Sequence, residues 1–198
     1  MSAAEGSAAR PRLIVGISGA SGTIYAVRAL EMLRKLNVET HLVMSRSAQV
    51  TLAYEMDLKV KDIEAMADVV YRNEDIGAAI SSGSFKNLGM LVAPCSIKTL
   101  SGIANCFADD LIVRAADVCL KERRKLVLMV RETPLHAGHI ELMDRATRSG
   151  AVIMPPVPSF YTRPRTIADI VDQTVGRALD QFGIRHRAVQ RWTEDPPE

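Results

Sequence analysis

Aromatic residues and an excess of charge of one sign are both scarce in this 198-residue sequence. Phe, Trp and Tyr make up 5% of the residues, too few to predict the platforms on which nucleic-acid bases stack. The 25 Lys and Arg residues against 23 Asp and Glu residues leave a net charge of only +2, so no large basic surface is predicted. The composition therefore disfavours a nucleic-acid-binding protein.

Cysteine is equally sparse, and long apolar segments are missing. The three cysteines, Cys95, Cys106 and Cys119, form no CxxC motif, which argues against a zinc ribbon or a disulfide framework. The opening M-S-A-A-E-G-S-A-A-R-P-R lacks the apolar segment of a secretory signal. No apolar run approaches the ~18 residues that a transmembrane helix needs. We therefore expect a soluble, cytoplasmic protein whose thiols are reduced.

The sequence does contain enough apolar material for one core. Hydrophobic residues make up 47% and charged residues 24%, the balance of an ordinary globular domain. A chain of this length buries roughly 70% of its unfolded surface and needs no disulfide or metal for stability. We expect a disordered lead over residues 1–11, one α/β domain over residues 12–184 and a C-terminal tail over residues 185–198.

Short apolar runs alternate with amphipathic segments along the chain. The apolar runs predict buried strands at residues 13–17, 38–44, 88–93, 126–130 and 151–154. The segments between them predict helices at residues 25–36, from 45 or 47, around 63–66, and at 97–106, 109–123, 138–149 and 166–182. The rest of residues 57–87 is predicted to be a polar irregular stretch. Strands that are apolar throughout need cover on both faces, so we expect a single doubly wound parallel sheet, Rossmann-like or flavodoxin-like, with helices on both faces.

Ligands of such a sheet bind beside the carboxyl ends of the strands. Hydroxyl groups, glycines and charged side chains gather in the segments that follow the predicted strands: Gly16–Gly22, Ser45, Pro94–Thr99, Arg131–Glu132 and Pro158–Tyr161. This agreement between position and polarity predicts a ligand site at that edge.

The first of these segments reads G-I-S-G-A-S-G and would direct backbone N–H groups at an anion. It differs from the dinucleotide motif because Ser18 stands where G-x-G-x-x-G has its second glycine. The second strand ends at Met44-Ser45, without the acidic residue that binds a ribose, and the P-loop lysine is missing. FMN, with one phosphate, therefore fits better than NAD or ATP. The alternative is a turn that only permits tight packing of strand and helix.

Other candidates have plain structural alternatives. Ser96 is better explained as a helix N-cap, and Cys95 beside it as a buried, unreactive thiol, because no base accompanies it. Arg114, Asp117 and Lys121 share one helix face, which is more often a solvated face than a site.

Four further charged residues are weighed in the same way. Arg177 has the alternative of an ion pair with Asp180, and Glu55 that of an ordinary surface carboxylate. Arg131 and Glu132 are more suggestive, since they directly follow a buried strand.

One histidine pair suggests a metal hypothesis. His136-x-x-His139 is followed by Glu141, but no third ligand is evident. A capped, hydrogen-bonded pair of histidines is the better interpretation, and we expect no metal.

Six longer motifs point to a family. They are G-I-S-G-A-S-G, A-P-C-S-I-K-T-L-S-G-I-A, R-A-A-D-V-C-L-K-E-R-R-K-L-V-L, R-E-T-P, G-A-V-I-M-P-P-V-P-S-F-Y and V-x-R-A-L-D-Q-F-G. Together they resemble the UbiX/Pad-type flavin prenyltransferases from about residue 12 to Trp192. The bacterial branch that accompanies hydroxyaromatic-acid decarboxylases is the most similar.

The resemblance implies a transferase that joins a dimethylallyl group from dimethylallyl phosphate to reduced FMN, first at N5 and then at C6. The prenylated FMN would pass to a UbiD-type decarboxylase. Enzymes of this family need no metal and assemble as dodecamers with sites at subunit interfaces, so the resemblance also implies a homododecamer.

Carried over residue by residue, the resemblance implies a flavin side and a donor side of one site. The flavin side comprises Gly19, Ala20, Ser21, Ser45, Ser96, Ile97, Lys98, Thr99 and Arg131. The donor side comprises Tyr161 and Arg177, joined by Lys121 and Arg114 from a neighbouring subunit. Glu55, Glu132 and Lys121 are the implied catalytic residues, and a raised glutamate pKa in an apolar pocket would suit proton transfer. Trp192 matches a C-terminal tryptophan motif whose role is open.

Two alternatives remain beside the prenyltransferase. A flavin-dependent cysteine decarboxylase of similar fold would carry a histidine in its first helix, and residues 22–36 contain none. A non-catalytic subunit would bind and deliver FMN without turnover. The chain also departs from the family at Leu135–His139, where a Ser or Thr often follows the R-E-x-P motif.

Overall fold

The computed structural model describes residues 9–192 and contains a six-stranded sheet in which neighbouring strands are parallel. The strands are β1 (Arg12–Ile17), β2 (Glu39–Met44), β3 (Val69–Arg72), β4 (Gly89–Cys95), β5 (Lys125–Val130) and β6 (Ala151–Ile153). Their order is β3-β2-β1-β4-β5-β6, so the chain winds outward from the centre in both directions and the order reverses between β1 and β4. The predicted doubly wound, Rossmann-like sheet is confirmed.

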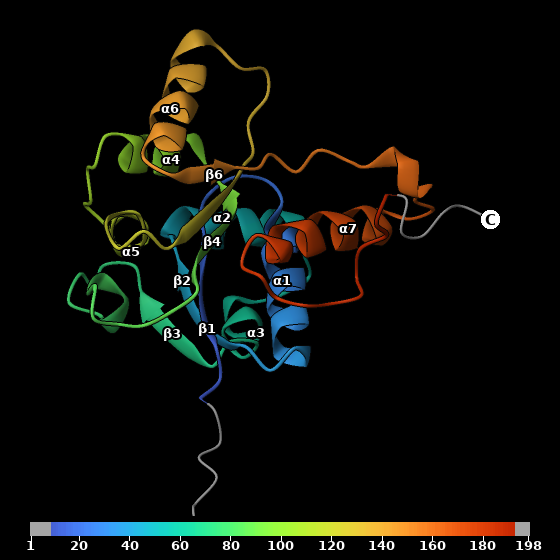
Figure 1. Cartoon of the computed structure of the whole chain (residues 1–198), viewed down its shortest axis with the longest axis horizontal. Helices are drawn as coiled ribbons and strands as arrows, with labels where there is room; N and C mark the ends of the chain where they lie inside the picture. Colours follow the sequence, from blue (N-terminus) through green and yellow to red (C-terminus); the bar gives the residue numbers. More distant parts are fainter. Residues whose placement is uncertain (1–8, 193–198) are drawn as a thin grey trace, which may run out of the picture.

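Helices cover both faces of this sheet (Figure 1). They are α1 (Thr23–Lys35), α2 (Arg46–Glu55), α3 (Val60–Glu64), α4 (Ile97–Ala104), α5 (Leu111–Lys121), α6 (Ala137–Arg148) and α7 (Ile167–Asp180), with short 3-10 turns η1 (Ala79–Ser81) and η2 (Phe160–Thr162). Buried residues of α1, α2, α3 and α7 pack on one face, and those of α4, α5 and α6 on the other.

The central strand β1 shows why the sheet is buried on both sides. Leu13, Val15 and Ile17 belong to the core beneath α1 and α7, whereas Ile14 belongs to the core beneath α5. Successive side chains of a strand point to opposite faces, so both sets must be apolar. This is the reason that the strands appear in the sequence as uninterrupted apolar runs.

Two details of the sheet differ from the sequence-based expectation. The polar stretch predicted after residues 63–66 contains the strand β3, which the prediction missed. β3 is a four-residue edge strand that pairs only with β2, and every second residue of it is exposed, so it leaves no apolar run. β4 also continues to Cys95, two residues beyond its predicted end at residue 93.

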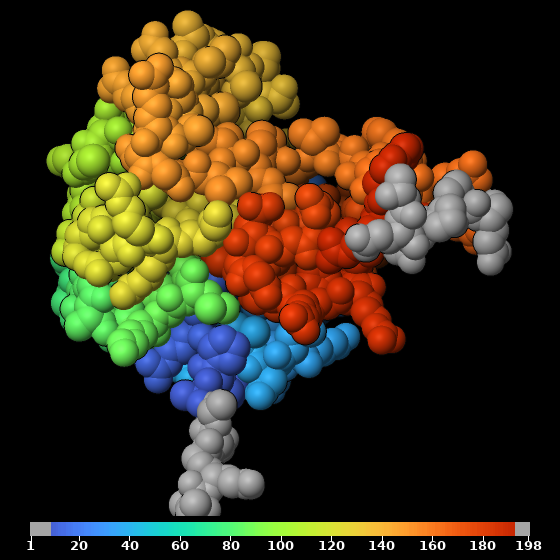
Figure 2. Space-filling model, viewed as in Figure 1, coloured from blue at the N-terminus to red at the C-terminus, as the bar shows by residue number. Residues whose placement is uncertain are grey.

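Between β6 and α7 the chain leaves the sheet as an arm, residues 154–165, that carries η2 (Figure 1). The C-terminal segment, residues 183–192, returns to it, and the Tyr161 and Trp192 ring centroids lie 5.2 Å apart. Figure 2 shows this segment in red against the arm in orange. The predicted tail is thus attached to the domain at least as far as Trp192, while residues 193–198 lie outside the described residues.

The predicted N-terminal lead also meets the domain. Arg10 donates to the Asp68 carboxylate at 2.8 Å, and Glu39 N–H donates to the Pro11 carbonyl at 2.8 Å. Residues 1–8 lie outside the described residues. Over residues 9–192, no helix combines the length and the apolar character needed to cross a bilayer.

Candidate functional site

The turn after β1 is hydrogen-bonded to the end of β4, exactly where the strand order reverses. The Ser18 hydroxyl donates to the Pro94 carbonyl at 2.9 Å and accepts from Ser96 N–H at 2.8 Å. Ser18 is 1% exposed, so these bonds are shielded from water and rigid. Ala20 N–H donates back to the Ser18 carbonyl at 2.9 Å. The predicted flavin segments 16–22 and 94–99 are therefore held side by side.

The start of α2 is the third segment at this edge. Ser45 N–H donates to the Ile17 carbonyl at 3.0 Å, and the Ser45 hydroxyl caps α2 by accepting from Ala48 N–H at 3.1 Å. Gly19 lies so close to α2 that a Cβ there would collide with the Cβ of Ser47. Glycine at this position therefore allows the turn and the helix start to approach each other.

The start of α4 is built in the same way. The Ser96 hydroxyl accepts from Thr99 N–H at 3.4 Å and donates to the Thr99 hydroxyl at 3.2 Å, which confirms its role as an N-cap. Ile97 packs against the core beneath α5, while the exposed Lys98 amine lies 3.7 Å from the Asp110 carboxylate. Among the predicted flavin residues 96–99, the exposed side chain is the polar Lys98.

Arg131 and Glu132 complete this edge. Arg131 N–H donates to the Cys95 carbonyl at 3.0 Å, so the residue stands directly beside the α4 start. Glu132 accepts from Thr133 N–H at 3.0 Å, and both side chains are exposed. Burial raises the pKa of the nearby Tyr25 hydroxyl, and the positive charge of Arg131 opposes that rise. We call the turn 18–22, the starts of α2 and α4, and Arg131 the carboxyl-edge cluster.

Glu55 reaches the cluster from the last turn of α2 and caps α1. Its carboxylate accepts from Gly22 N–H at 2.9 and 3.0 Å and from Thr23 N–H at 3.0 Å. Burial raises the pKa of the Glu55 carboxyl, but hydrogen bonds from Ser21, Thr23 and Gly22 outweigh burial and bring the pKa below its usual value. Glu55 therefore does not have the raised pKa that an apolar pocket would give a glutamate. It is an exposed carboxylate, as the structural alternative predicts, and it stands as an anion at the N-terminus of α1.

A second group of predicted residues lies on α7 and the arm. The Arg177 guanidinium donates to the Asp180 carboxylate at 2.7 Å, the ion pair that the spacing predicts. Tyr161 is 43% exposed and its ring packs edge-on against Trp192. We call Tyr161, Arg177 and Trp192 the arm group.

Lys121 and Arg114 join neither group within one chain. Lys121 is the last residue of α5, and β5 begins at Lys125, so Lys121 lies at the amino edge of the sheet. Its amine pairs there with Glu122 at 2.5 Å, beside the loop around Gly83 that precedes β4. Arg114, two turns earlier, pairs with Asp117 at 2.9 Å. Both positions are on the solvated helix face that the spacing predicts.

The sequence and structure comparisons are in agreement. A family model described as Flavoprotein matches residues 1–179. The flavin prenyltransferase UbiX of Thauera aromatica is 57% identical over 182 residues, which cover 92% of this chain and 94% of that protein. The chain belongs to the UbiX family of flavin prenyltransferases. The resemblance seen in the motifs is confirmed, and membership of this family decides against a cysteine decarboxylase.

Two solved structures match this flavin prenyltransferase over nearly its whole length. AnUbiX (PadA1), in complex with FMN and dimethylallyl pyrophosphate, has a TM-score of 0.92 and 50% identity over 93% of this chain and 98% of that chain. A dodecameric FMN-dependent UbiX-like decarboxylase from Escherichia coli O157:H7 has a TM-score of 0.89 and 50% identity over 91% of this chain and 98% of that chain.

Cys95 and the histidine pair have structural roles in this flavin prenyltransferase. Burial raises the pKa of the Cys95 thiol to about 12, which agrees with the expected unreactive thiol. His136 caps α6 by accepting from Gly138 N–H at 3.1 Å, and its ring centroid lies 3.7 Å from that of His139. Among residues 9–192, no three His, Cys, Asp or Glu side chains come together as a metal site.

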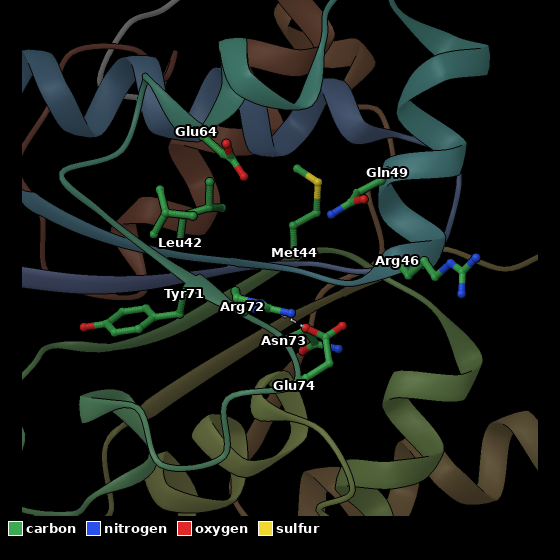
Figure 3. A pocket seen from close by; sticks show the side chains of 10 residues that line it. Leu42, Met44, Arg46, Gln49, Glu64, Tyr71, Arg72, Asn73 and Glu74 are labelled. Atoms are coloured by element: carbon green, nitrogen blue, oxygen red, sulfur yellow. Dashed lines mark ion pairs between the residues drawn. The ribbon is translucent and has the colours of Figure 1, made fainter.

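Sequence reasoning missed a cavity of about 360 Å³ between β2, β3 and α2 (Figure 3). Leu42, Met44 and Tyr71 contribute to its lining, and Arg72 and Glu74 stand side by side with Nε and Oε2 3.9 Å apart. Because β3 is not evident in the sequence, the shared wall that these residues form could not be predicted. The cavity adjoins the α2 start but includes none of the predicted site residues.

Proposed function

We propose that this flavin prenyltransferase joins a dimethylallyl group from dimethylallyl phosphate to N5 and C6 of reduced FMN and delivers the prenylated FMN to a UbiD-type decarboxylase. The carboxyl-edge cluster carries this proposal, because it brings three polar turns of the predicted flavin side to the point where the strand order reverses. When bound, reduced FMN supplies the nucleophilic nitrogen and carbon.

The cluster fits FMN as a ligand with one phosphate. Glu55 already accepts from Gly22 N–H and Thr23 N–H, so these two groups are not free to bind the phosphate. We therefore place the phosphate at the starts of α2 and α4, beside Ser45, Ser96 and Arg131, where helix dipoles and the guanidinium favour negative charge. Gly19 leaves room for the close approach of α2.

The donor side has to stabilise a leaving phosphate. When the C1–O bond of dimethylallyl phosphate breaks, the electron pair stays on the phosphate oxygen, and cationic donors stabilise the charge that develops there. We assign this role to Tyr161, Arg177, Lys121 and Arg114. To bind the phosphate of the donor, Arg177 has to leave its ion pair with Asp180. Lys121 likewise has to leave its ion pair with Glu122.

Glu55 and Glu132 are the candidates for proton handling. Glu55 is held as a carboxylate by the hydrogen bonds of the α1 start, so it is suited to accept a proton rather than to donate one. The exposed Glu132 is fixed to the Thr133 amide and follows directly on Arg131. Both lie at the carboxyl edge, near the proposed flavin.

The distance of Lys121 from the carboxyl edge favours a site shared between copies. In one chain Lys121 stands at the amino edge of the sheet, and the Escherichia coli relative is a dodecamer. We propose a homododecamer in which Lys121 and Arg114 enter the site of a neighbour. We also propose a cytoplasmic location, because reduced FMN and the free thiols of Cys95, Cys106 and Cys119 both suit a reducing compartment.

Anaerobic incubation of the purified protein with reduced FMN and dimethylallyl phosphate tests the activity. The flavin extracted afterwards should be heavier by one five-carbon prenyl unit in mass spectrometry. Flavin that binds but keeps its mass would contradict the proposal and favour an FMN-delivery subunit. The same incubation with dimethylallyl pyrophosphate shows which donor is used.

A further inference from the structure

Gln173, in the middle of α7, is a buried polar residue whose amide is fully engaged. It is 5% exposed, and its Nε2 donates to the Tyr161 hydroxyl at 3.3 Å and to the Gln190 carbonyl at 3.2 Å. Its Oε1 accepts from Gln190 N–H at 3.0 Å. A buried amide without partners destabilises a protein. The arrangement of the three segments in which all these bonds form is therefore favoured over others.

The three segments are far apart in the sequence. Tyr161 lies on the arm, Gln173 on α7 and Gln190 on the C-terminal segment, which lie against one another in Figure 2. Tyr161 is 43% exposed and Trp192 is 71% exposed, so packing alone leaves both rings considerable freedom. The Tyr161 hydroxyl accepts from the buried Gln173 amide and donates to the Gln190 carbonyl at 3.5 Å, so Gln173 supplies the buried one of the two contacts that fix it.

Arg177 is tied to the same C-terminal segment one helical turn later. Asp180 accepts from Arg177 at 2.7 Å and from Arg191 at 3.0 Å, and the His186 ring lies 3.1 Å away. Gln173 and Arg177 are four residues apart and therefore on one side of α7. Tyr161 and Arg177, the two donor-side residues on the arm and α7, are thus linked to residues 186–191.

We propose that Gln173 is a positioning residue for the donor site, which holds the Tyr161 hydroxyl and the Gln190 backbone so that Tyr161, Trp192 and Arg177 face one donor molecule. This inference rests on the proposed function, since it takes dimethylallyl phosphate as the ligand of Tyr161 and Arg177. Gln173 itself touches no reacting atom in this arrangement; it acts through Tyr161.

The test compares Gln173→Met with a matched control. Methionine keeps the length of the side chain and removes all three hydrogen bonds. Thr174→Val is the control, because the neighbouring buried Thr174 hydroxyl donates only within α7, to the Ile170 carbonyl at 2.7 Å. Three quantities are measured on the intact protein: KM and kcat with dimethylallyl phosphate, affinity for FMN, and fluorescence of Trp192, the only tryptophan.

For Gln173→Met we expect KM for dimethylallyl phosphate to rise about fivefold or more, the loss expected for a hydrogen-bonded position. The affinity for FMN and kcat should stay within about twofold, because the hydrogen bonds of Gln173 go to Tyr161 and Gln190 and not to the carboxyl-edge cluster. Trp192 emission without ligands should shift to longer wavelength as the C-terminal segment loosens. Thr174→Val should leave all of these quantities at the wild-type values.

Two results would overturn the inference: wild-type KM and emission in Gln173→Met, or the same changes in Thr174→Val. If Gln173→Met does not fold, Tyr161→Phe takes its place in the test, because it changes an exposed side chain. It removes the bond with Gln173 together with the bond to the Gln190 carbonyl, and it has to reproduce the emission shift. Trp192 emission does not depend on turnover. A wild-type protein that makes no prenylated FMN would therefore contradict the proposed function, while the emission of Gln173→Met would still show whether Gln173 holds the C-terminal segment.

Discussion

The two sides of the proposed site are held in place by different kinds of contact. The carboxyl-edge cluster rests on backbone carbonyls and N–H groups joined through Ser18, which is 1% exposed. The arm group rests on side-chain contacts: the Tyr161 and Trp192 rings, 43% and 71% exposed, pack edge-on, and the Gln173 amide donates to the Tyr161 hydroxyl. Buried backbone contacts preorganise a ligand site, whereas exposed segments are the usual place for parts that close or that meet another subunit. We therefore expect the carboxyl-edge cluster to be preorganised within one chain and the arm group to be completed by a second subunit.

Arg177→Ala should give the largest effect and separate the two sides. Removing a charged hydrogen-bond donor from a phosphate weakens its binding by about 10- to 100-fold, so KM for dimethylallyl phosphate should rise by that factor. Affinity for FMN, measured by titration of the flavin absorbance, should change by less than about twofold. Equal losses for both ligands would contradict the division into a flavin side and a donor side.

Gly19→Ala should damage the flavin side instead. The added Cβ collides with the Cβ of Ser47, so the turn and the α2 start must move apart, at a cost of about 1–3 kcal/mol in the free energy of unfolding. FMN should bind about tenfold more weakly if the turn and the α2 start together position the phosphate. Gly77→Ala is the control: like Gly19 it has no positive φ, but an added Cβ there meets nothing nearer than the Asp75 carboxylate, at an ordinary contact distance of 3.5 Å. An unchanged FMN affinity in Gly19→Ala would exclude the α2 start from the site.

Glu55→Gln should have a smaller effect that depends on pH. The pKa of Glu55 is lowered in the folded protein, so its contribution to stability is present above the unfolded pKa of about 4.5 and disappears as pH falls through the folded value. Denaturation curves should therefore show wild-type protein more stable than Glu55→Gln at pH 7, and the gap should close below about pH 4.5. A gap that is the same at pH 3 and pH 7 would show that the carboxylate charge does not cap α1.

Cys95→Ala should have the smallest effect on turnover. The thiol is buried, and its pKa of about 12 keeps it protonated at neutral pH. The substitution should lower stability by about 1 kcal/mol through the lost packing, and kcat should stay within about twofold. A large loss of kcat in a folded variant would indicate that Cys95 acts as a nucleophile.

The difference between buried and exposed segments also explains which parts of the fold can be predicted from the sequence. Runs such as Leu13–Ile17 are apolar because both faces are covered, so the central strands and the polar residues that follow them are predictable. β3 is not, because a half-exposed edge strand of four residues has no distinct pattern.

The contacts of Glu55 and Gln173 were also beyond sequence reasoning. Both side chains bind segments distant in the chain: Glu55 the start of α1, Gln173 the arm and residue 190. Neither spacing nor composition indicates partners of this kind, since only the tertiary fold brings them together. The motif resemblance implies a role for Glu55 near the flavin but does not indicate the direction of its pKa shift.

Subunit complementation tests most directly whether the donor side is completed by a second copy. Lys121→Ala and Arg177→Ala protein are each assayed alone, then unfolded together in equal amounts, refolded and assayed again. If Lys121 and Arg177 come from different subunits, about a quarter of the mixed sites carry both intact residues, and activity should recover to about a quarter of wild type. Activity that stays at the level of the single variants would show that each site takes both residues from one chain and would contradict the account.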